Sequence, residues 1–187
     1  MVHMNQNRIN LEFEVVLQLI RLDSYGRDLA RELDVPLTNI QRSLQSLQEN
    51  NIIDFKKIGN NKIYSLKNNL IARQIIFNAE NYKLLNLISK YPYLEHLLED
   101  ILKQSSSNLV ILFGSYAKFR ANKNSDIDLY IETKDKNIKK KLEDLHSRLN
   151  VKIGLFDNRS LLIQEIIKDH VILKGVEVYY DKIKFFA

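Results

Sequence analysis

The stretch that decides the fold is LVILFGSYAKFRANKNSDIDLYIE, residues 109–132. It begins with a run of five apolar residues, Leu109 to Phe113, which is too short for an independent helix and rich in residues that favour strands. Gly114 and Ser115 end this run and lead into a short segment of helix-forming residues. From Ser125 to Glu132 polar and apolar residues alternate, so we predict a second strand there.

Two carboxylates project from one face of this second strand. Asp126 and Asp128 are two residues apart, and the residues between and after them face the other way. Carboxylate oxygens at this spacing suit one divalent cation, Mg²⁺ or Mn²⁺, which shares its other ligand positions with water and substrate phosphates. The alternative is that Asp126 belongs to a turn and Asp128 is an exposed strand residue. We favour the metal pair, because aspartate is depleted in strands and two like charges on one face repel each other without a cation.

The turn between the two strands has the features of a phosphate site. Gly114 allows the backbone to approach a phosphate closely, and the Ser115 hydroxyl and the following N–H groups are hydrogen-bond donors for it. Lys118 follows three residues later, with Arg120 and Lys123 behind it, so positive charge there would attract a triphosphate or a polynucleotide. Phosphoryl-type transfer requires a phosphate-binding site next to a metal-binding site, and the two parts of this stretch provide both.

A strand, Gly114-Ser115, ten intervening residues and then Asp126-Ile-Asp128 together resemble the signature of the DNA polymerase β-type nucleotidyltransferases, above all the minimal forms of bacteria and archaea. The resemblance covers about residues 105–187 and includes the tail from Leu161 to Gly175. It implies that Asp126 and Asp128 hold Mg²⁺ or Mn²⁺ and that Gly114, Ser115 and Lys118 bind a nucleoside triphosphate.

Active members of that superfamily place a third acid on the strand that follows the metal-binding pair. We predict that strand over residues 151–156, after a helix over 135–149, and the alternating positions on one of its faces are Lys152 and Gly154. Asp157 lies just past the strand. By the alternation of side chains it falls on the side of the apolar residues, so the chain needs a bulge or bend for Asp157 to reach the site. Three interpretations stay open: Asp157 is the third catalytic acid, one metal is enough for catalysis, or the domain binds nucleotides without turnover.

Composition excludes several classes of protein. The chain has 187 residues, 45% of them hydrophobic and 27% charged, which is typical of a soluble globular protein. No apolar run approaches the roughly 18 residues of a membrane span, and no signal-peptide pattern is present, so we expect a cytoplasmic protein without membrane contact. The absence of cysteine excludes disulfides and cysteine chemistry. The net charge of +5 lies outside residues 1–66, which contain eight basic and eight acidic residues.

Residues 1–66 show a different pattern. We predict helices over 10–22, 27–33 and 37–50, a turn at Ser24-Tyr-Gly26, and strands over 52–58 and 62–66 joined by a turn at Gly59. This order resembles a winged helix-turn-helix domain, and the sequence is similar to that of small prokaryotic regulators. The resemblance implies that residues 37–50 form the recognition helix. The side chains expected to contact DNA or RNA are Thr38, Asn39, Gln41, Arg42 and Gln45 of the helix and Lys57 of the wing. The alternative is a winged helix used for dimerisation or protein contact.

The fold expected for the whole chain is therefore α+β. We predict a winged helix-turn-helix domain at 1–66, a helical linker at 67–104 and a nucleotidyltransferase-like mixed α/β sheet at 105–187, with the boundary at the polar segment QSSSN, residues 104–108. In its last part we predict a helix over 161–168 and short strands over 171–175 and 176–180. The apolar linker helix either packs across the two-fold axis of a homodimer or is buried between the domains.

Two functions compete at this stage. The first is a Mg²⁺-dependent nucleotidyltransferase, of EC 2.7.7 type, that moves a nucleoside monophosphate onto a hydroxyl of a protein, an RNA or a small molecule. Related minimal nucleotidyltransferases act as antitoxins that modify a HEPN-type partner protein, so a protein acceptor is realistic. The second is a nucleic-acid-binding transcriptional regulator whose C-terminal domain senses nucleotide or is inactive.

Overall fold

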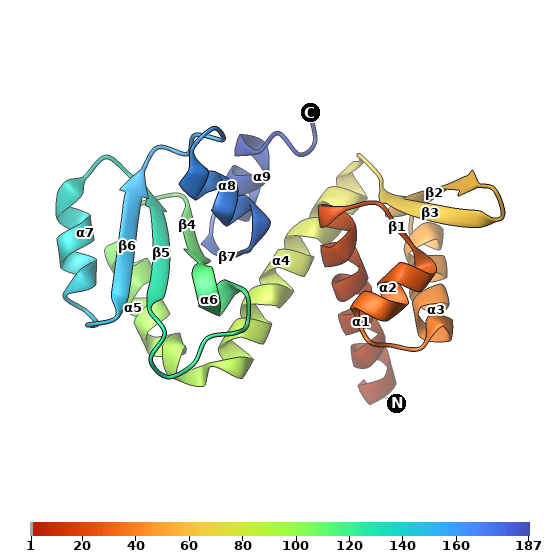
Figure 1. Cartoon of the computed structure of the whole chain (residues 1–187), viewed down its shortest axis with the longest axis horizontal. Helices are drawn as coiled ribbons and strands as arrows, with labels where there is room; N and C mark the ends of the chain where they lie inside the picture. The colour runs from red at the N-terminus through yellow and green to blue at the C-terminus, as the bar shows by residue number, and fades with distance from the viewer. Residues whose placement is uncertain (1) are drawn as a thin grey trace. The chain divides into compact units, whose positions relative to one another are not determined.

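The computed structural model describes the backbone of residues 2–187 and the side chains of residues 10–187. The chain forms two compact units, of which the first ends at Tyr82 and the second comprises Lys83–Ala187. Each unit contains one β-sheet, so the chain is mixed α+β as expected (Figure 1). Among the described residues, every helix is either too short or too polar to span a bilayer.

The first unit combines helices with a small antiparallel sheet, in which β3 lies between β1 and β2. Its elements are α1 (Val2–Arg21), β1 (Ser24–Tyr25), α2 (Gly26–Glu32), α3 (Leu37–Glu49), β2 (Ile53–Ile58), β3 (Asn61–Leu66) and the first part of α4 (Leu70–Lys90). The predicted helices and the predicted hairpin are present, within a few residues at each end except at the start of α1. Gly59 occupies the hairpin turn with φ of +59°, a conformation that favours glycine.

The segment Ser24–Tyr25, predicted as a turn, is instead the short strand β1. Ser24 pairs with Tyr64 and Tyr25 pairs with Ile63, so β1 adds a third strand to the hairpin. Two residues are too few to show strand periodicity, and only the neighbouring strand β3 gives this segment its partner.

The second unit is built on a four-stranded sheet of order β6-β5-β4-β7. Strand β4 runs antiparallel to both of its neighbours, and β5 runs parallel to β6. The elements are the end of α4, η1 (Pro92–Leu94), α5 (Glu95–Gln104), β4 (Val110–Phe113), α6 (Gly114–Ala117), β5 (Ile127–Glu132), α7 (Lys136–Glu143), β6 (Leu149–Gly154), α8 (Leu161–Lys168), β7 (His170–Lys174) and α9 (Val176–Lys182).

Different helices cover the two faces of this sheet. On one face, α5 and α7 pack onto the apolar residues of the strands, with Leu98, Ile101 and Leu142 in one core cluster with Leu112 and Leu129. The opposite face of β5 contains Asp128, Tyr130 and Glu132, and α9 packs there through ring contacts from Tyr179 to His170 and Phe156. Figure 1 shows α7 at the β6 edge of the sheet and α8 and α9 near β7. The apolar face is therefore fully covered, whereas the carboxylates lie on the face that also bears polar groups.

Three predictions for the second unit need correction. Residues 176–180, predicted as a strand, form the helix α9, because Gly175 with φ of +86° ends β7 and because Val176, Tyr179 and Tyr180 are buried at helical spacing. Helix α7 ends at Glu143 and is shorter than the predicted helix over 135–149, and β6 begins at Leu149, two residues before the predicted start. Helix α5, in the second half of the predicted linker segment, packs in the same core cluster as the strands of the second unit.

Candidate functional site

The turn after β4 brings the backbone against a carboxylate. Phe113, the last residue of β4, pairs with Asp128 of β5, and Gly114 follows at the start of α6 with φ of +72°. A Cβ placed on Gly114 would collide with the Oδ2 atom of Asp128. Glycine is thus required twice over at this position, for its backbone conformation and for the space beside the carboxylate. Ser115, the next residue, is partly buried.

Asp126 and Asp128 form the carboxylate pair predicted from the sequence pattern. Asp126 is exposed and directly precedes β5, whereas Asp128 lies within the strand and is partly buried. Burial raises the pKa of Asp128, and the negative charges of Asp126 and Glu165 raise it further. A hydrogen bond from Asn150 and the positive charge of Lys152 act in the opposite direction on this pKa. The ionised form of Asp128 is therefore less favoured than that of an exposed aspartate, because of burial and neighbouring negative charge.

Asn150 is a site residue that the sequence interpretation missed. Strands β5 and β6 are parallel, and their register pairs Asp128 with Asn150 and Tyr130 with Lys152. The Nδ2 atom of Asn150 donates a hydrogen bond of 2.7 Å to Oδ1 of Asp128. The sequence predicts that this strand starts at residue 151 and that the preceding helix ends at 149, so Asn150 is left between the two elements. The sequence feature that could have indicated it is spacing: Asn150 and Lys152 are two residues apart, so in a strand their side chains lie on the same face.

Asp157 lies at a different part of the sheet from Asn150. It is exposed, and its Oδ1 accepts hydrogen bonds from the backbone N and the Nε of Arg159, at 3.0 and 3.4 Å. The backbone N–H of Arg159 is the main cause of the lowered pKa of Asp157. From Asn150, the partner of Asp128, the chain runs seven residues to Asp157, or about 23 Å if it were fully extended. A role for Asp157 as the third acid stays a prediction.

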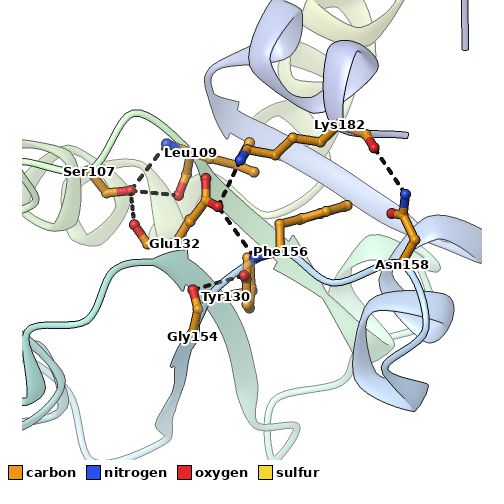
Figure 2. Close-up of polar contacts among 8 residues, drawn as sticks. All are labelled: Ser107, Leu109, Tyr130, Glu132, Gly154, Phe156, Asn158 and Lys182. Carbon is orange, nitrogen blue, oxygen red and sulfur yellow. Dashed lines mark hydrogen bonds and ion pairs between the residues drawn. The ribbon is translucent and has the colours of Figure 1, made fainter. Parts of the chain in front are cut away.

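The residues on either side of Asp157 are held near Glu132 and α9 (Figure 2). Oε1 of Glu132 accepts hydrogen bonds from Nζ of Lys182 at 2.8 Å and from the backbone N of Phe156 at 3.3 Å. Asn158 donates from Nδ2 to the carbonyl of Lys182 at 3.0 Å. Glu132 is four residues, or about 13 Å along the strand, from Asp128. These contacts hold Phe156 and Asn158, the residues on both sides of Asp157.

Tyr130 and Ser107 extend the same group of contacts to the strand backbones (Figure 2). The Tyr130 hydroxyl donates to the carbonyl of Gly154 at 3.0 Å, and the Ser107 hydroxyl lies 2.9 Å from the carbonyl of Glu132. The end of β5 at Glu132 is thus rigidly bonded to its surroundings. We assign it a structural part in positioning β5.

Lys118 lies in an ion pair with a residue that we had not considered. Its Nζ is 3.9 Å from Oε1 of Glu165 on α8, and both side chains are partly exposed. Glu165 also adds to the raised pKa of Asp128, so α8 brings a further negative charge into the neighbourhood of the carboxylate pair. Only the packing of α8 places Glu165 here.

The carboxylate pair fits a divalent cation in part. Asp126 and Asp128 provide hard oxygen ligands, and Asp128 lies directly against the Gly114 turn. Within the described part of the chain, however, His, Asp and Glu side chains nowhere gather in a group of three or more able to hold a metal ion. The protein therefore offers two carboxylates, and bound phosphates and water are needed to complete the ligand set of Mg²⁺.

In the first unit, the predicted nucleic-acid contacts share one exposed surface of α3. Thr38, Asn39, Gln41, Arg42 and Gln45 are all exposed, whereas the residues between them that face inward, Ile40, Leu44 and Leu47, are buried. Gln45 donates to Glu49 at 2.8 Å, and the charge of Glu49 offsets that of Arg42 on this helix. Lys57 is exposed on β2 opposite Lys62.

Comparison with known proteins gives a family model and several chains of solved structures. Residues 96–179 match the family model described as Polymerase beta, Nucleotidyltransferase. One of these chains, described as a crystal structure of a toxin–antitoxin with AMP-PNP, shares 24% identity, covers 49% of this chain and 80% of its own, and has a TM-score of 0.37. No curated protein matches the chain significantly. The matched residues extend from α5 to α9 and include Gly114, Asp126, Asp128 and Asn150, so the carboxylate site lies within a region similar to a polymerase β nucleotidyltransferase domain.

Proposed function

We propose that the protein is a Mg²⁺-dependent nucleotidyltransferase. The observation that carries the proposal is the contact of the Gly114 turn with Asp128, beside Asp126, inside the region that matches the nucleotidyltransferase family. Asp126 and Asp128 hold Mg²⁺ or Mn²⁺, which neutralises phosphate charge when bound. Gly114 and Ser115 bind the phosphates of a nucleoside triphosphate, and Lys118 adds positive charge near them.

The transfer makes one bond to phosphorus and breaks another. The oxygen of the acceptor hydroxyl attacks the α-phosphorus, and the bond from this phosphorus to the oxygen that bridges it to the β-phosphorus breaks. Pyrophosphate leaves, and the proton of the hydroxyl passes to water or to a nearby base. The acceptor is a hydroxyl of a protein, an RNA or a small molecule. The toxin–antitoxin description of the similar structure makes a protein acceptor the first to test.

We further propose that the first unit is a winged helix-turn-helix domain that binds nucleic acid or a partner. The helices α1 to α3, followed by the β2–β3 hairpin, and the uniformly exposed polar face of α3 support this proposal. A homodimer formed through α4 is part of the same hypothesis, since Leu70, Ile71 and Leu85 of this helix are exposed.

The second candidate function is a nucleic-acid-binding regulator whose second unit senses nucleotide without turnover. One observation favours it: an amide, Asn150, rather than a carboxylate, pairs with Asp128 on the neighbouring strand. In this case nucleotide binding at Asp126 and Asp128 would alter the affinity of the first unit for DNA, and no covalent product would form.

Thermal unfolding with Mg²⁺ and each nucleoside triphosphate tests the nucleotide site, and transfer from α-labelled nucleotide tests the reaction. A ligand at about 100 times its Kd stabilises the folded state by about 2.7 kcal/mol, which raises the melting temperature by several degrees. We expect this shift in the wild type and in Asp144→Asn, a change of an exposed carboxylate directly after α7, but not in Asp126→Asn/Asp128→Asn. A shift without labelled product would favour the regulator, and no shift with any triphosphate would refute both functions of the site.

A further inference from the structure

Asn150 holds Asp128 from the side of β6. Because an ionised carboxylate only accepts hydrogen bonds, the amide nitrogen is the atom of Asn150 that faces it, and the Nδ2–Oδ1 distance is 2.7 Å. From the side of β4, the backbone of Gly114 lies against the other oxygen, Oδ2. Asp128 is thus held between two fixed groups, and its carboxylate is oriented before any ligand binds.

The same residue also determines the charge of the site. Asn150 occupies the position directly opposite Asp128 in the register of β5 and β6, and Lys152 follows on the same face of β6. An amide there adds no charge, and the lysine adds a positive one. Around this position the chain therefore presents two carboxylates, Asp126 and Asp128, and one ammonium group. Glu132, at the far end of β5, is bonded to Lys182.

Such a donor set suits one divalent cation. Two cations in a shared site lie about 3.5–4 Å apart and each requires anionic oxygen ligands, so their mutual repulsion has to be offset by several carboxylates. Glu165 does not complete such a group, because the described side chains contain no cluster of three acidic or histidine ligands and because Lys118 lies 3.9 Å from its Oε1.

We propose that Asn150 orients Asp128 as a metal ligand and restricts this site to a single divalent cation. The inference rests on the proposed nucleotide site and concerns its metal content. With one cation on the triphosphate, no second cation lowers the pKa of the acceptor hydroxyl. The proton must then leave to water or to a base on the acceptor itself, and transfer is slower than in a site with three carboxylates. Asn150 is a positioning residue in this scheme.

The test counts bound metal rather than product. Protein is saturated with Mn²⁺ and the α,β-methylene analogue of ATP, which cannot be cleaved at the α-phosphorus. Retained manganese is measured by metal analysis, and electron paramagnetic resonance reports whether two ions are exchange-coupled. We expect one uncoupled Mn²⁺ per wild-type chain and a coupled pair in Asn150→Asp. The control Asn137→Asp makes the same change of charge on an exposed position of α7 and should retain one Mn²⁺.

A second variant tests the orienting role separately. Asn150→Ala removes the hydrogen bond to Asp128 and should weaken the binding of the single Mn²⁺ by about 10-fold or more, the usual effect of losing a group that orients a metal ligand. Unchanged affinity would refute this role.

The wild-type count decides the proposal even if Asn150→Asp does not fold. A coupled pair in the wild type, or a folded Asn150→Asp that retains one ion, would overturn the single-cation inference while leaving the nucleotide site intact. Failure of the wild type to retain any Mn²⁺ with the analogue would overturn the proposed nucleotide site together with this inference.

Discussion

Gly114 lies against Asp128 so closely that no side chain could replace its hydrogen. The backbone of Gly114 is in the left-handed region, with φ of +72°, and a Cβ at this residue would meet Oδ2 of Asp128. The two halves of the predicted motif, separated by more than ten residues in sequence, are therefore in direct contact. This contact explains why a glycine and an aspartate are required together: each limits what the other position can hold.

Gly114→Ala should both destabilise the second unit and abolish nucleotide binding. The left-handed conformation costs an alanine about 1–2 kcal/mol, and the collision with Asp128 adds to that. Gly59→Ala is the matched control, since Gly59 has φ of +59° but no atom within 4 Å of the added Cβ, so it reports the conformational cost alone. Urea unfolding and the nucleotide-dependent thermal shift measure the two effects. Equal losses of stability in both variants would contradict the contact.

Asp128→Asn should stabilise the protein in the absence of metal. The pKa of Asp128 is raised mainly by burial, so in the interval between its ordinary and its raised value the folded state binds more protons than the unfolded state. The free energy of unfolding therefore falls as pH rises through this interval. At neutral pH the ionised Asp128 destabilises the folded state, whereas the neutral amide of the Asp128→Asn variant does not. Unfolding at neutral and at acidic pH checks the sign, since the advantage of the variant should disappear once Asp128 is protonated. With Mg²⁺ and nucleotide the order should reverse.

Tyr116 should make the second unit sensitive to strongly alkaline pH. Burial, followed by a hydrogen bond with Tyr93, raises the pKa of Tyr116 to about 12. Because the unfolded state loses this proton at about pH 10, stability should be present below pH 10 and fall as pH rises toward 12. Tyr93→Phe removes the hydrogen bond and should lower the pKa of Tyr116, which nuclear magnetic resonance of labelled tyrosine can follow. An unchanged titration of Tyr116 in this variant would refute the contribution of Tyr93.

Glu165→Gln should increase the affinity for nucleoside triphosphate. Glu165 forms an ion pair with Lys118 and would compete with phosphate for it if Lys118 binds nucleotide as proposed. Its removal also lowers the negative charge near Asp128. Both side chains of the ion pair are partly exposed, so we expect an effect of about 1 kcal/mol or less, up to roughly fivefold in Kd. Glu99→Gln breaks a comparable exposed ion pair with Lys103 on α5 and serves as the control. Calorimetric titration measures the affinity, and weaker binding in Glu165→Gln would show that this carboxylate assists the site.

Arg42→Ala and Lys57→Ala should weaken binding to duplex DNA if the first unit binds nucleic acid. Each lost phosphate contact lowers the magnitude of the slope of log K against log salt by about 0.9. Fluorescence anisotropy with random-sequence DNA at several salt concentrations measures this slope. Lys140→Ala, on the exposed side of α7, should leave it unchanged. If neither Arg42 nor Lys57 alters the slope, the exposed face of α3 would be assigned to a protein partner instead.

Patterns within short stretches were enough to predict several elements and the places of the candidate site residues on them. The apolar run before Gly114 predicted β4, and the alternation from Asp126 to Glu132 predicted β5 with both carboxylates on one face. The periodicity of residues 37–50 predicted α3 and its exposed polar residues. These features depend on side-chain periodicity and turn chemistry, which act over a few residues and are therefore visible in the sequence alone.

Only the tertiary structure decided how separate segments meet. The register of β5 and β6 pairs Asp128 with Asn150, and the packing of α8 places Glu165 beside Lys118. Residues 176–180 have strand-forming side chains, yet they form α9 because burial of Val176, Tyr179 and Tyr180 outweighs local preference. The physical reason is the same in each case. Strand register and helix packing are set by burial and hydrogen bonding over the whole sheet, and no local pattern in the sequence records them.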